Sequence, residues 1–500
     1  MRKLTNLRSL DVNWCDKLTH MPSGIEELTL LNKLPRFIVG HKSSIENSAK
    51  LSDLKNLNNL RGVLNIYVHR NFEDSMLEAT EANLSHKHGL TNLNIRFIWS
   101  VPFGDADCEH DEAILEGLKP NSNLRILGVN NYEGQKLPSW ARMDNLSIIP
   151  NLVRIIFFNF GCCKQLPTLS QLHFLKDLVI ANMESVEYME DCVCDISSSK
   201  AAQGLEYTLF FPSLEVLELS GLRNLKGWWK LSSEFAGPRS MQFSKLSSLI
   251  IDGCPNLIML PLCPMVEDLT LSNANKRMLM LGSGMKLKRL TIGNAEDLMS
   301  LSNHCLHQLS HLTIIEDRKL ESSERLVEIF ATLSSSLRSL TFNECHKLRS
   351  ISKGLEHLTA LDNLRLICCE ELDLSRYEAE VGMPWKALNT SLRSLELYEL
   401  DKLVGLPNGL QHLANLHSLI LTENRELKEL PEWIDCFTSL EYLELYRCPN
   451  LKYLPAAFRN LTAMNQLRIL QCPMLTERCR HPNAVDWPKI QHIPLVSILD

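Results

Sequence analysis

The chain has 500 residues, of which 45% are hydrophobic, so it can bury a continuous core and whole-chain disorder is excluded. Its formal net charge is -7, and the Lys and Arg residues are scattered rather than grouped in basic blocks, which argues against nucleic acid as a partner. Neither a secretory signal nor a run of about 18 apolar residues is found, so we predict no membrane span and a cytoplasmic location, with a nuclear pool also open.

A short leucine pattern recurs along nearly the whole chain. It is L-x-x-L-x-L, and it first appears in LRSLDV, which begins at Leu7. Further copies, some with another apolar residue in place of a leucine, begin at Leu60, Leu90, Leu124, Leu152, Leu175, Leu214, Leu246, Val266, Leu287, Leu309, Leu337 and Leu361. The last four copies follow at intervals of 24 residues, at Leu392, Leu416, Leu440 and Met464. About 17 units can be counted, and this pattern with a period of roughly 20–29 residues is typical of leucine-rich repeats.

Each copy of the pattern predicts one short β-strand. In L-x-L both leucines lie on the same face of the strand, because strand side chains alternate with a period of two. One unit cannot bury its apolar edge alone, so stacked units share a core and align their strands in a parallel sheet. The sequence therefore predicts an α/β solenoid, a leucine-rich-repeat horseshoe. Its parallel β-sheet is expected on the concave face, with loops, 3-10 turns and short helices on the convex face.

A second feature of the repeat is a slot for Asn or Cys after the strand. Three residues beyond the last strand leucine, or its equivalent, stand Cys15, Cys254, Cys345, Cys369, Asn424, Cys448 and Cys472. A buried Cys behaves as a small apolar residue with a weak S–H donor. We therefore interpret these residues as structural, and without a secretory signal we expect the thiols to be reduced.

Four longer stretches interrupt the repeats, at 41–50, 100–112, 184–211 and 373–390. Insertions of this kind usually form loops. The second stretch carries the acidic residues Asp105, Asp107, Glu109, Asp111 and Glu112, which indicate a solvated loop, with a contact site as the alternative. We predict a repeat array over 1–475 and a C-terminal capping segment over 476–500.

Motifs for nucleotide binding, metal binding and catalysis are missing. The patterns G-x-x-x-x-G-K-[ST], H-E-x-x-H and G-x-S-x-G do not occur in the sequence. Cys192 and Cys194 lie among carboxylates, but zinc needs four converging ligands and only one close Cys pair is present. We therefore predict a non-catalytic protein without a cofactor or a metal.

The 24-residue period places side chains of neighbouring repeats in columns on the outward face of the sheet. The position between the two strand leucines is filled in turn by Glu396, Ile420, Glu444 and Arg468. Tyr and Arg are enriched among the residues that dominate interface energies. The predicted protein-binding face consists of Glu396, Tyr398, Tyr442, Glu444, Tyr446, Arg447 and Arg468. The alternative is that each of them is an ordinary surface residue.

Several longer phrases are more specific than the leucine pattern. They are LTHMPSGIEELTLLNKLPRFIVG, LKNLNNLRGVLNI, LPTLSQLHFLKDLVI, FPSLEVLELSGLRNLKGW and the ending CPMLTERCRHPNAVDWPKIQHIP. Together they resemble the leucine-rich-repeat region of plant intracellular NLR (NB-ARC-LRR) disease-resistance proteins of the coiled-coil class. Ala484 and Val485 stand where that family usually has Gly-Glu, and the sequence shows no counterpart of the family's coiled-coil and nucleotide-binding domains.

The resemblance implies a recognition module of plant innate immunity. Such a module senses a pathogen effector or a guarded host protein, and in a full-length receptor it holds the NB-ARC domain inactive, in cis or in trans. The alternative is a stand-alone adaptor, such as a ubiquitin-ligase substrate receptor or a regulatory decoy. The first repeat has an apolar flank without a polar cap, so we expect residues 7–12 to fray and Met1 to be an internal methionine or a truncation boundary.

Overall fold

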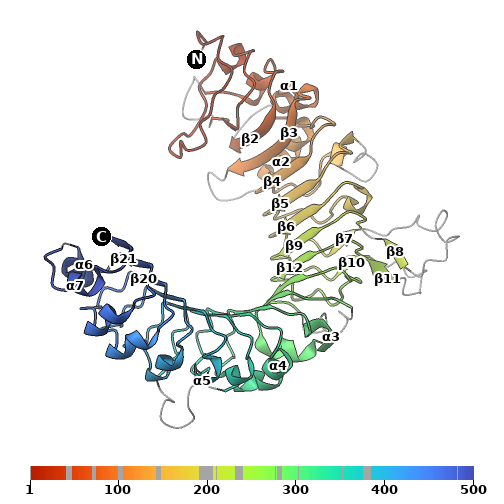
Figure 1. Cartoon of the computed structure of the whole chain (residues 1–500). Helices are drawn as coiled ribbons and strands as arrows, with labels where there is room; N and C mark the ends of the chain where they lie inside the picture. Colours follow the sequence, from red (N-terminus) through yellow and green to blue (C-terminus); the bar gives the residue numbers. More distant parts are fainter. Residues whose placement is uncertain are drawn as a thin grey trace. The chain divides into compact units, whose positions relative to one another are not determined.

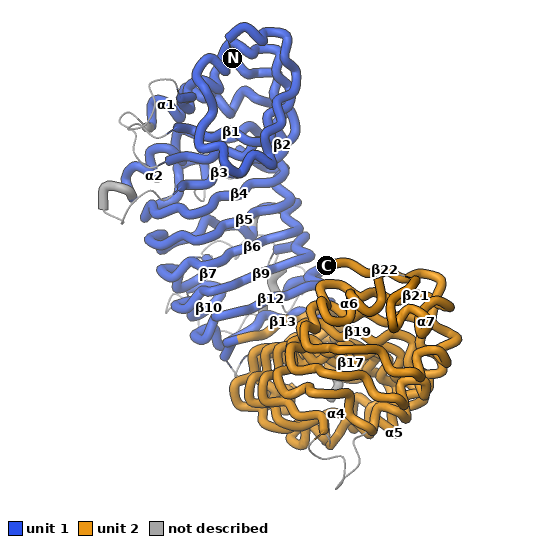
Figure 2. The backbone as a smooth tube through the Cα atoms, turned by 90° about the vertical axis from the view of Figure 1, so that its left-hand side faces the viewer, with its two compact units in different colours: residues 1–266, 273–282 blue, residues 267–272, 283–500 orange. Residues whose placement is uncertain are grey.

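The structure is a computed structural model of the chain. It describes residues 2–40, 48–69, 75–98, 105–141, 148–190, 207–209, 211–230, 240–275, 278, 284–301, 303–351, 353–375, 385–480 and 482–500. The chain divides into two compact units, coloured separately in Figure 2. Unit 1 contains residues 1–266 and 273–282, and unit 2 contains residues 267–272 and 283–500. Each unit stacks its repeats along a parallel sheet.

The sheet of unit 1 runs in the order β1-β2-β3-β4-β5-β6-β9-β12. Its strands are β1 (Arg36–Ile38), β2 (Gly62–His69), β3 (Leu90–Ile98), β4 (Ile126–Asn130), β5 (Arg154–Phe158), β6 (Asp177–Ala181), β9 (Val216–Ser220) and β12 (Ser248–Asp252). Two small parallel pairs join β7 (Tyr188–Glu190) to β10 (Gly227–Trp229) and β8 (Tyr207–Leu209) to β11 (Ser240–Gln242). Alternate residues of β9 and β12 are buried, as the L-x-L spacing predicts.

The sheet of unit 2 runs from β13 to β22 in chain order. Its strands are β13 (Asp268–Ser272), β14 (Arg289–Ile292), β15 (His311–Ile315), β16 (Ser339–Asn343), β17 (Asn363–Ile367), β18 (Ser394–Tyr398), β19 (Ser418–Thr422), β20 (Tyr442–Tyr446), β21 (Gln466–Leu470) and β22 (Leu495–Leu499). Within this unit the strands line one side of the stack, and α3, α4 and α5 lie along the other (Figure 1).

Short helices return the chain from one strand to the next. The α-helices are α1 (Ser75–Glu81), α2 (Asp105–Gly117), α3 (Asn303–Leu306), α4 (Val327–Thr332), α5 (Trp385–Leu388), α6 (Pro473–Cys479) and α7 (Trp487–Ile490). The 3-10 helices are η1 (Ile25–Glu27), η2 (Leu51–Leu54), η3 (Leu84–His86), η4 (Ser139–Ala141), η6 (Leu169–Gln171), η9 (Ala295–Ser300), η10 (Ser323–Leu326), η11 (Leu355–His357), η12 (Asn408–His412), η13 (Glu432–Cys436) and η14 (Ala456–Asn460). Parallel strands that alternate with short helices confirm the predicted solenoid. None of the helices in the described residues is long and apolar enough to cross a membrane.

The residue that follows a strand takes a left-handed backbone conformation in many repeats. In unit 2 these residues are Glu316, Glu344, Cys368, Glu399, Glu423, Arg447 and Gln471, with φ between 49° and 54°. The N–H of Glu399 donates to the carbonyl of Thr422 at 2.9 Å, and the N–H of Glu423 donates to that of Tyr446 at 2.8 Å. The backbone hydrogen bonds between neighbouring repeats thus continue one residue past the strand. The chain then turns toward the core, where the slot residue lies.

The acidic stretch predicted as a solvated loop is instead largely helical. Helix α2 begins at Asp105, and the buried carboxylate of Asp111 accepts a hydrogen bond from the N–H of Glu133 at 2.9 Å. Glu112 accepts from the N–H groups of Gln135 and Lys136. The prediction was wrong because these carboxylates satisfy backbone donors of the next loop rather than water. Residues 41–47, 191–206 and 376–384 of the other predicted insertions lie outside the described residues, Cys192 and Cys194 included.

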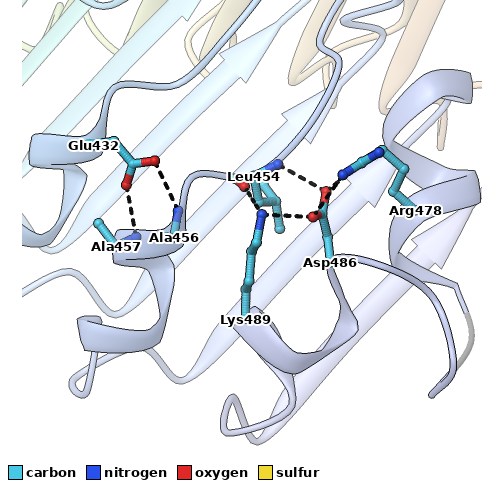
Figure 3. Close-up of polar contacts among 7 residues, drawn as sticks. All are labelled: Glu432, Leu454, Ala456, Ala457, Arg478, Asp486 and Lys489. Atoms are coloured by element: carbon cyan, nitrogen blue, oxygen red, sulfur yellow. Dashed lines mark hydrogen bonds and ion pairs between the residues drawn. The ribbon is translucent and has the colours of Figure 1, made fainter.

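A buried carboxylate ties α7 to the last repeats of unit 2. Asp486 accepts hydrogen bonds from Arg478 Nε at 2.8 Å and from the N–H of Leu454 at 3.2 Å, and Lys489 Nζ lies 2.7 Å from its other oxygen (Figure 3). Lys489 also donates to the carbonyl of Leu454. Burial raises the pKa of Asp486, but the bonds from Arg478 and Lys489 outweigh burial and hold this pKa below its usual value. In the neighbouring contact of Figure 3, Glu432 accepts from the first N–H groups of η14.

Candidate functional site

The structure aligns the outward side chains of β18 to β21 in the predicted columns. Glu396 pairs in register with Ile420, Ile420 with Glu444, and Glu444 with Arg468. The neighbouring columns hold Tyr398, Thr422, Tyr446 and Leu470 on one side and Ser394, Ser418, Tyr442 and Gln466 on the other. The predicted register is confirmed, because the constant 24-residue period brings equivalent positions of successive repeats opposite each other.

Three of the predicted residues form one polar network at β20 and β21. Arg468 Nη1 donates to Glu444 Oε2 at 2.9 Å and lies 3.4 Å from the hydroxyl of Tyr442. The Tyr442 hydroxyl donates to the same carboxylate. Burial, and then the hydrogen bond to Glu444, raises the pKa of Tyr442. The network fixes the side chains, so a partner meets a preorganised surface rather than mobile groups.

Arg447 occupies the left-handed position after β20 and contacts three neighbouring side chains. Its guanidinium lies 5.0 Å from the ring centroid of Tyr446, 2.9 Å from Glu423 Oε1 and 2.6 Å from Gln471 Oε1. The hydrogen bond to Glu423 raises the pKa of Arg447. A hollow of about 280 Å³ opens here, lined by Glu423, Arg425, Arg447, Pro449 and Gln471.

The predicted binding face did not include several other polar residues that lie on this side of the sheet. Arg365 of β17 forms an ion pair with Glu396 at 2.9 Å, and Cys368 donates from Sγ to Glu399 at 3.4 Å. Burial and then the Glu399 hydrogen bond raise the pKa of Cys368 to about 12. Burial, followed by the charge of Glu423, raises the pKa of Tyr398. Glu423 and Glu399 were detectable, because they precede the slot residue at the same repeat position as Arg447.

Most of the residues assigned to the structural slot lie in the core. Cys254, Cys345, Cys369, Asn424, Cys448 and Cys472 are fully buried. Asn424 donates to the carbonyl of Leu397 at 2.8 Å and accepts from the N–H of Leu400 at 3.0 Å. Cys448 donates to the equivalent carbonyl, that of Leu421, with its sulfur at 3.6 Å. Cys15 differs, because it is exposed.

Hydrogen bonds from Cys369 and Cys448 lower the pKa of Cys345 and Cys472, respectively. Burial has the opposite effect and makes other slot cysteines poor nucleophiles. It raises the pKa of Cys254 to about 11, and hydrogen bonding to Cys472 together with burial raises that of Cys448. A thiol with a raised pKa carries little of the reactive thiolate. Of the residues that the structure describes, no group of three or more His, Cys, Asp and Glu side chains is arranged to hold a metal.

Comparison with known proteins agrees with the repeat geometry. A family model described as R13L1/DRL21 LRRs matches residues 51–183. The chain has a leucine-rich-repeat fold. It is 34% identical over 232 residues to the disease resistance protein RGA2 of Solanum bulbocastanum, an alignment that covers 46% of this chain and 22% of that protein. It is 29% identical over 339 residues to the putative disease resistance protein RGA1 of the same plant, and this alignment covers 68% of this chain and 29% of RGA1.

A similar protein from another plant genus is also described as a disease resistance protein. The putative disease resistance RPP13-like protein 1 of Arabidopsis thaliana is 26% identical over 342 residues, which cover 66% of this chain and 29% of that protein. The predicted resemblance of this leucine-rich-repeat chain to the repeat region of plant disease-resistance proteins is confirmed by these matches. The chain spans less than a third of the length of these relatives.

Solved structures similar to this leucine-rich-repeat protein are distant. The alignment with the crystal structure of a TLR13–ssRNA13 complex covers 99% of this chain and 61% of the chain in that structure, with 16% sequence identity and a TM-score of 0.43. The alignment with a Leptospira interrogans LRR protein covers 98% of this chain and 96% of that protein, with 17% sequence identity and a TM-score of 0.34. The fold assignment therefore rests on the strand register of this chain.

Proposed function

We propose that this protein is a non-catalytic recognition module of plant innate immunity that binds a pathogen effector or a modified host protein. The observation that carries the proposal is the exposed face of β18 to β21, where Tyr, Arg and Glu side chains stand in aligned columns. Such residues supply large contact areas and directed hydrogen bonds at interfaces. The similarity to plant disease resistance proteins supports the immune role.

In a full-length receptor the same repeats would hold an NB-ARC domain in its inactive state, in cis or in trans. Binding of the effector shifts that equilibrium only if the effector prefers the released state, because a ligand that binds both states equally shifts nothing. This role places the protein in the cytoplasm or the nucleus.

The binding face is tested by replacing Tyr442, Tyr446 and Arg468 together with Ala. Purified effector proteins and host proteins are screened by surface plasmon resonance against the full chain, and each protein that binds is measured again with the variant. We expect a loss of at least tenfold in affinity, because interface Tyr and Arg side chains each contribute more than about 1 kcal/mol where they act as hot spots.

A matched triple variant replaces His412, Lys452 and Arg459 with Ala. These exposed residues lie on η12, after β20 and on η14, away from the columns. We expect this variant to bind like the wild type. Unchanged affinity of the column variant, with an intact circular dichroism spectrum, would rule out this face as the binding site.

A further inference from the structure

Two arginines of unit 1 lie against one tyrosine on the outward face of the sheet. The guanidinium carbon of Arg36 is 4.9 Å from the ring centroid of Tyr67, and that of Arg96 is 5.9 Å from the same centroid. Arg96 pairs with Tyr67 across β2 and β3, while Arg36 lies on β1, on the other side of β2. The three side chains thus occupy adjacent strands, and we call them the Arg-Tyr-Arg cluster.

The cluster differs from the other arginines of the sheet faces in its charge balance. Arg154, Arg365 and Arg468 each form an ion pair with a carboxylate at 3.1, 2.9 and 2.9 Å. In the described part of the chain no carboxylate lies within ion-pair distance of Arg36 or Arg96. Arg36 donates from Nη1 to the carbonyl of Asn13 at 3.3 Å, and its Nε is buried without a hydrogen-bond partner among these residues.

Stacking on a ring orders a guanidinium without consuming its donors. The planar group presents its face to the aromatic ring, while its N–H groups point outward in the plane. Those donors match the two oxygens of a carboxylate in a bidentate pair. The Arg-Tyr-Arg cluster therefore holds two oriented cations, and toward an anion Arg36 offers Nη2, because its Nη1 is bonded to Asn13 and its Nε is buried. Among the described residues, the donors of Arg96 have no acceptor.

A row of amides fixes the backbone next to the cluster. Asn65 donates to the carbonyl of Pro35 at 2.6 Å, and Asn94 donates to Asn65 Oδ1 at 2.8 Å. The residue opposite Asn94 on β4 is Gly128, and a Cβ atom at this position would lie 2.0 Å from Asn94 Oδ1. A side chain at position 128 would displace this amide, so the glycine leaves room for the hydrogen-bonded row.

A hollow lies next to the cluster, and its lining includes Asn13, which accepts from Arg36, and Asn65, which pairs with Arg36 across β1 and β2. Its volume is about 660 Å³, and it is lined by Asp11, Asn13, Asn32, Lys33, Pro35, Arg61, Gly62, Val63 and Asn65. Asp11 and Lys33 neutralise each other at 3.1 Å, which leaves Arg61 as a further positive charge of the lining. The hollow can receive the side chains or backbone of a bound segment beside the two arginines.

We propose that the Arg-Tyr-Arg cluster binds an acidic protein segment in an extended conformation, with one carboxylate on Arg36 and a second on Arg96. The tyrosine ring separates the two cations, so two monoanions fit better than one phosphate dianion, which needs cations that converge on a point. Side chains on one side of an extended segment recur about every 7 Å. The two guanidinium carbons lie 4.9 and 5.9 Å from one ring centroid, so they are close enough together for neighbouring carboxylates of such a segment to reach both. This surface belongs to unit 1 and goes beyond the proposed function, whose residues lie in unit 2.

The test measures the full chain against a fluorescein-labelled peptide of six Gly-Glu units by fluorescence polarisation. We expect the peptide to bind, with an affinity that falls as salt is raised, and the matching Gly-Gln peptide not to bind. The double variant Arg36→Gln/Arg96→Gln is expected to lose at least tenfold in affinity. Arg36→Lys/Arg96→Lys, which keeps the charge but not the bidentate donors, is expected to fall between the two.

The matched control is Lys452→Gln/Arg459→Gln, which removes the same charge from an exposed region of unit 2. It should bind the Gly-Glu peptide like the wild type, and circular dichroism melting checks that each variant folds. The proposal is overturned if the Gly-Glu peptide does not bind, if the control loses as much as the double variant, or if the Gly-Gln peptide binds equally. It is also overturned if a phosphoserine peptide or an anionic phosphatidylserine vesicle binds more tightly through the two arginines.

Discussion

Lys87 is a buried charge that the repeat pattern does not require. It follows η3, its side chain is fully buried, and its Nζ lies 3.3 Å from Asn58 Oδ1. Burial lowers the pKa of Lys87 to about 8 from 10.5. Because the unfolded chain keeps this proton up to about pH 10.5, the wild type gains stability as pH rises from 8 to 10.5 and carries the full penalty below 8.

We predict that Lys87→Met changes this pH dependence. At pH 7 the variant avoids the cost of burying an ammonium group, and this advantage should shrink by about 3 kcal/mol between pH 7.5 and 10.5. Urea unfolding of both proteins at several pH values measures the difference. The exposed Lys55→Met serves as control, and a difference between Lys87→Met and wild type that does not vary with pH would contradict the interpretation.

The residue scale also shows what the sequence could predict. Asn424 is buried and Glu444 alternates with the buried leucines of β20, as the fixed period predicts, because it gives each repeat position one orientation. Tyr67 could not be linked to Arg36 and Arg96 in this way, because the repeats that carry them differ in length, and the register across β1, β2 and β3 is set by packing and by an irregularity at Gly62 and Val63. Cys15 fills its slot by spacing but lies outside the core.

At the scale of elements, α7 is held by a buried charge as well as by the buried side chain of Ile490. Asp486 is buried between Arg478 and Lys489, and it also binds the N–H of Leu454 in the preceding repeat. Removal of one partner from such a buried set leaves the others desolvated and unpaired. The capping role predicted for 476–500 therefore depends on this carboxylate.

We predict that Asp486→Asn lowers the free energy of unfolding by about 3 kcal/mol at pH 7. The contribution of the wild-type carboxylate is fully present above its unfolded pKa of 3.8 and is lost as pH falls through the lower folded value. Thermal unfolding across this pH range measures the loss. Arg480→Gln removes the exposed pair with Asp500 and should change stability by less than about 1 kcal/mol, so equal losses in the two variants would refute the role of burial.

Helix α2 shows the limit of prediction for elements. A run of acidic residues indicates a solvated segment, and the pattern carries no apolar stripe of helical spacing. The carboxylates of Asp111, Glu112 and Glu116 instead accept from backbone N–H groups of residues 133–139, and these partners are distant in sequence. Strand existence was predictable from L-x-L, whereas this helix depends on contacts that no local pattern encodes.

On the scale of the whole molecule, burial is uneven along the array. Leu4 and Trp14 are 53% and 93% exposed, and residues 7–12 form only an isolated bridge, between Ser9 and Lys33. By contrast, Leu443 and Leu445 of β20 are fully buried between paired strands. Local stability follows such differences in burial and hydrogen bonding.

We expect amide hydrogens of 7–12 to exchange at least roughly tenfold faster than those of 440–445 in the isolated chain. Hydrogen exchange measured by mass spectrometry at neutral pH provides the comparison. Equal protection of the two segments would show that the first repeat is as stable as the others.

The charges in the middle column of unit 2 make the order of its repeats matter. The column consists of Arg365, Glu396, Ile420, Glu444 and Arg468, so one ion pair lies on each side of the neutral Ile420. Loss of residues 417–440 keeps every leucine in phase, yet it brings the two glutamates onto neighbouring strands about 4.8 Å apart, where like charges repel. Removal of this repeat therefore leaves the core in phase but places like charges side by side on the surface, and Ile420 is the residue that keeps the two glutamates apart.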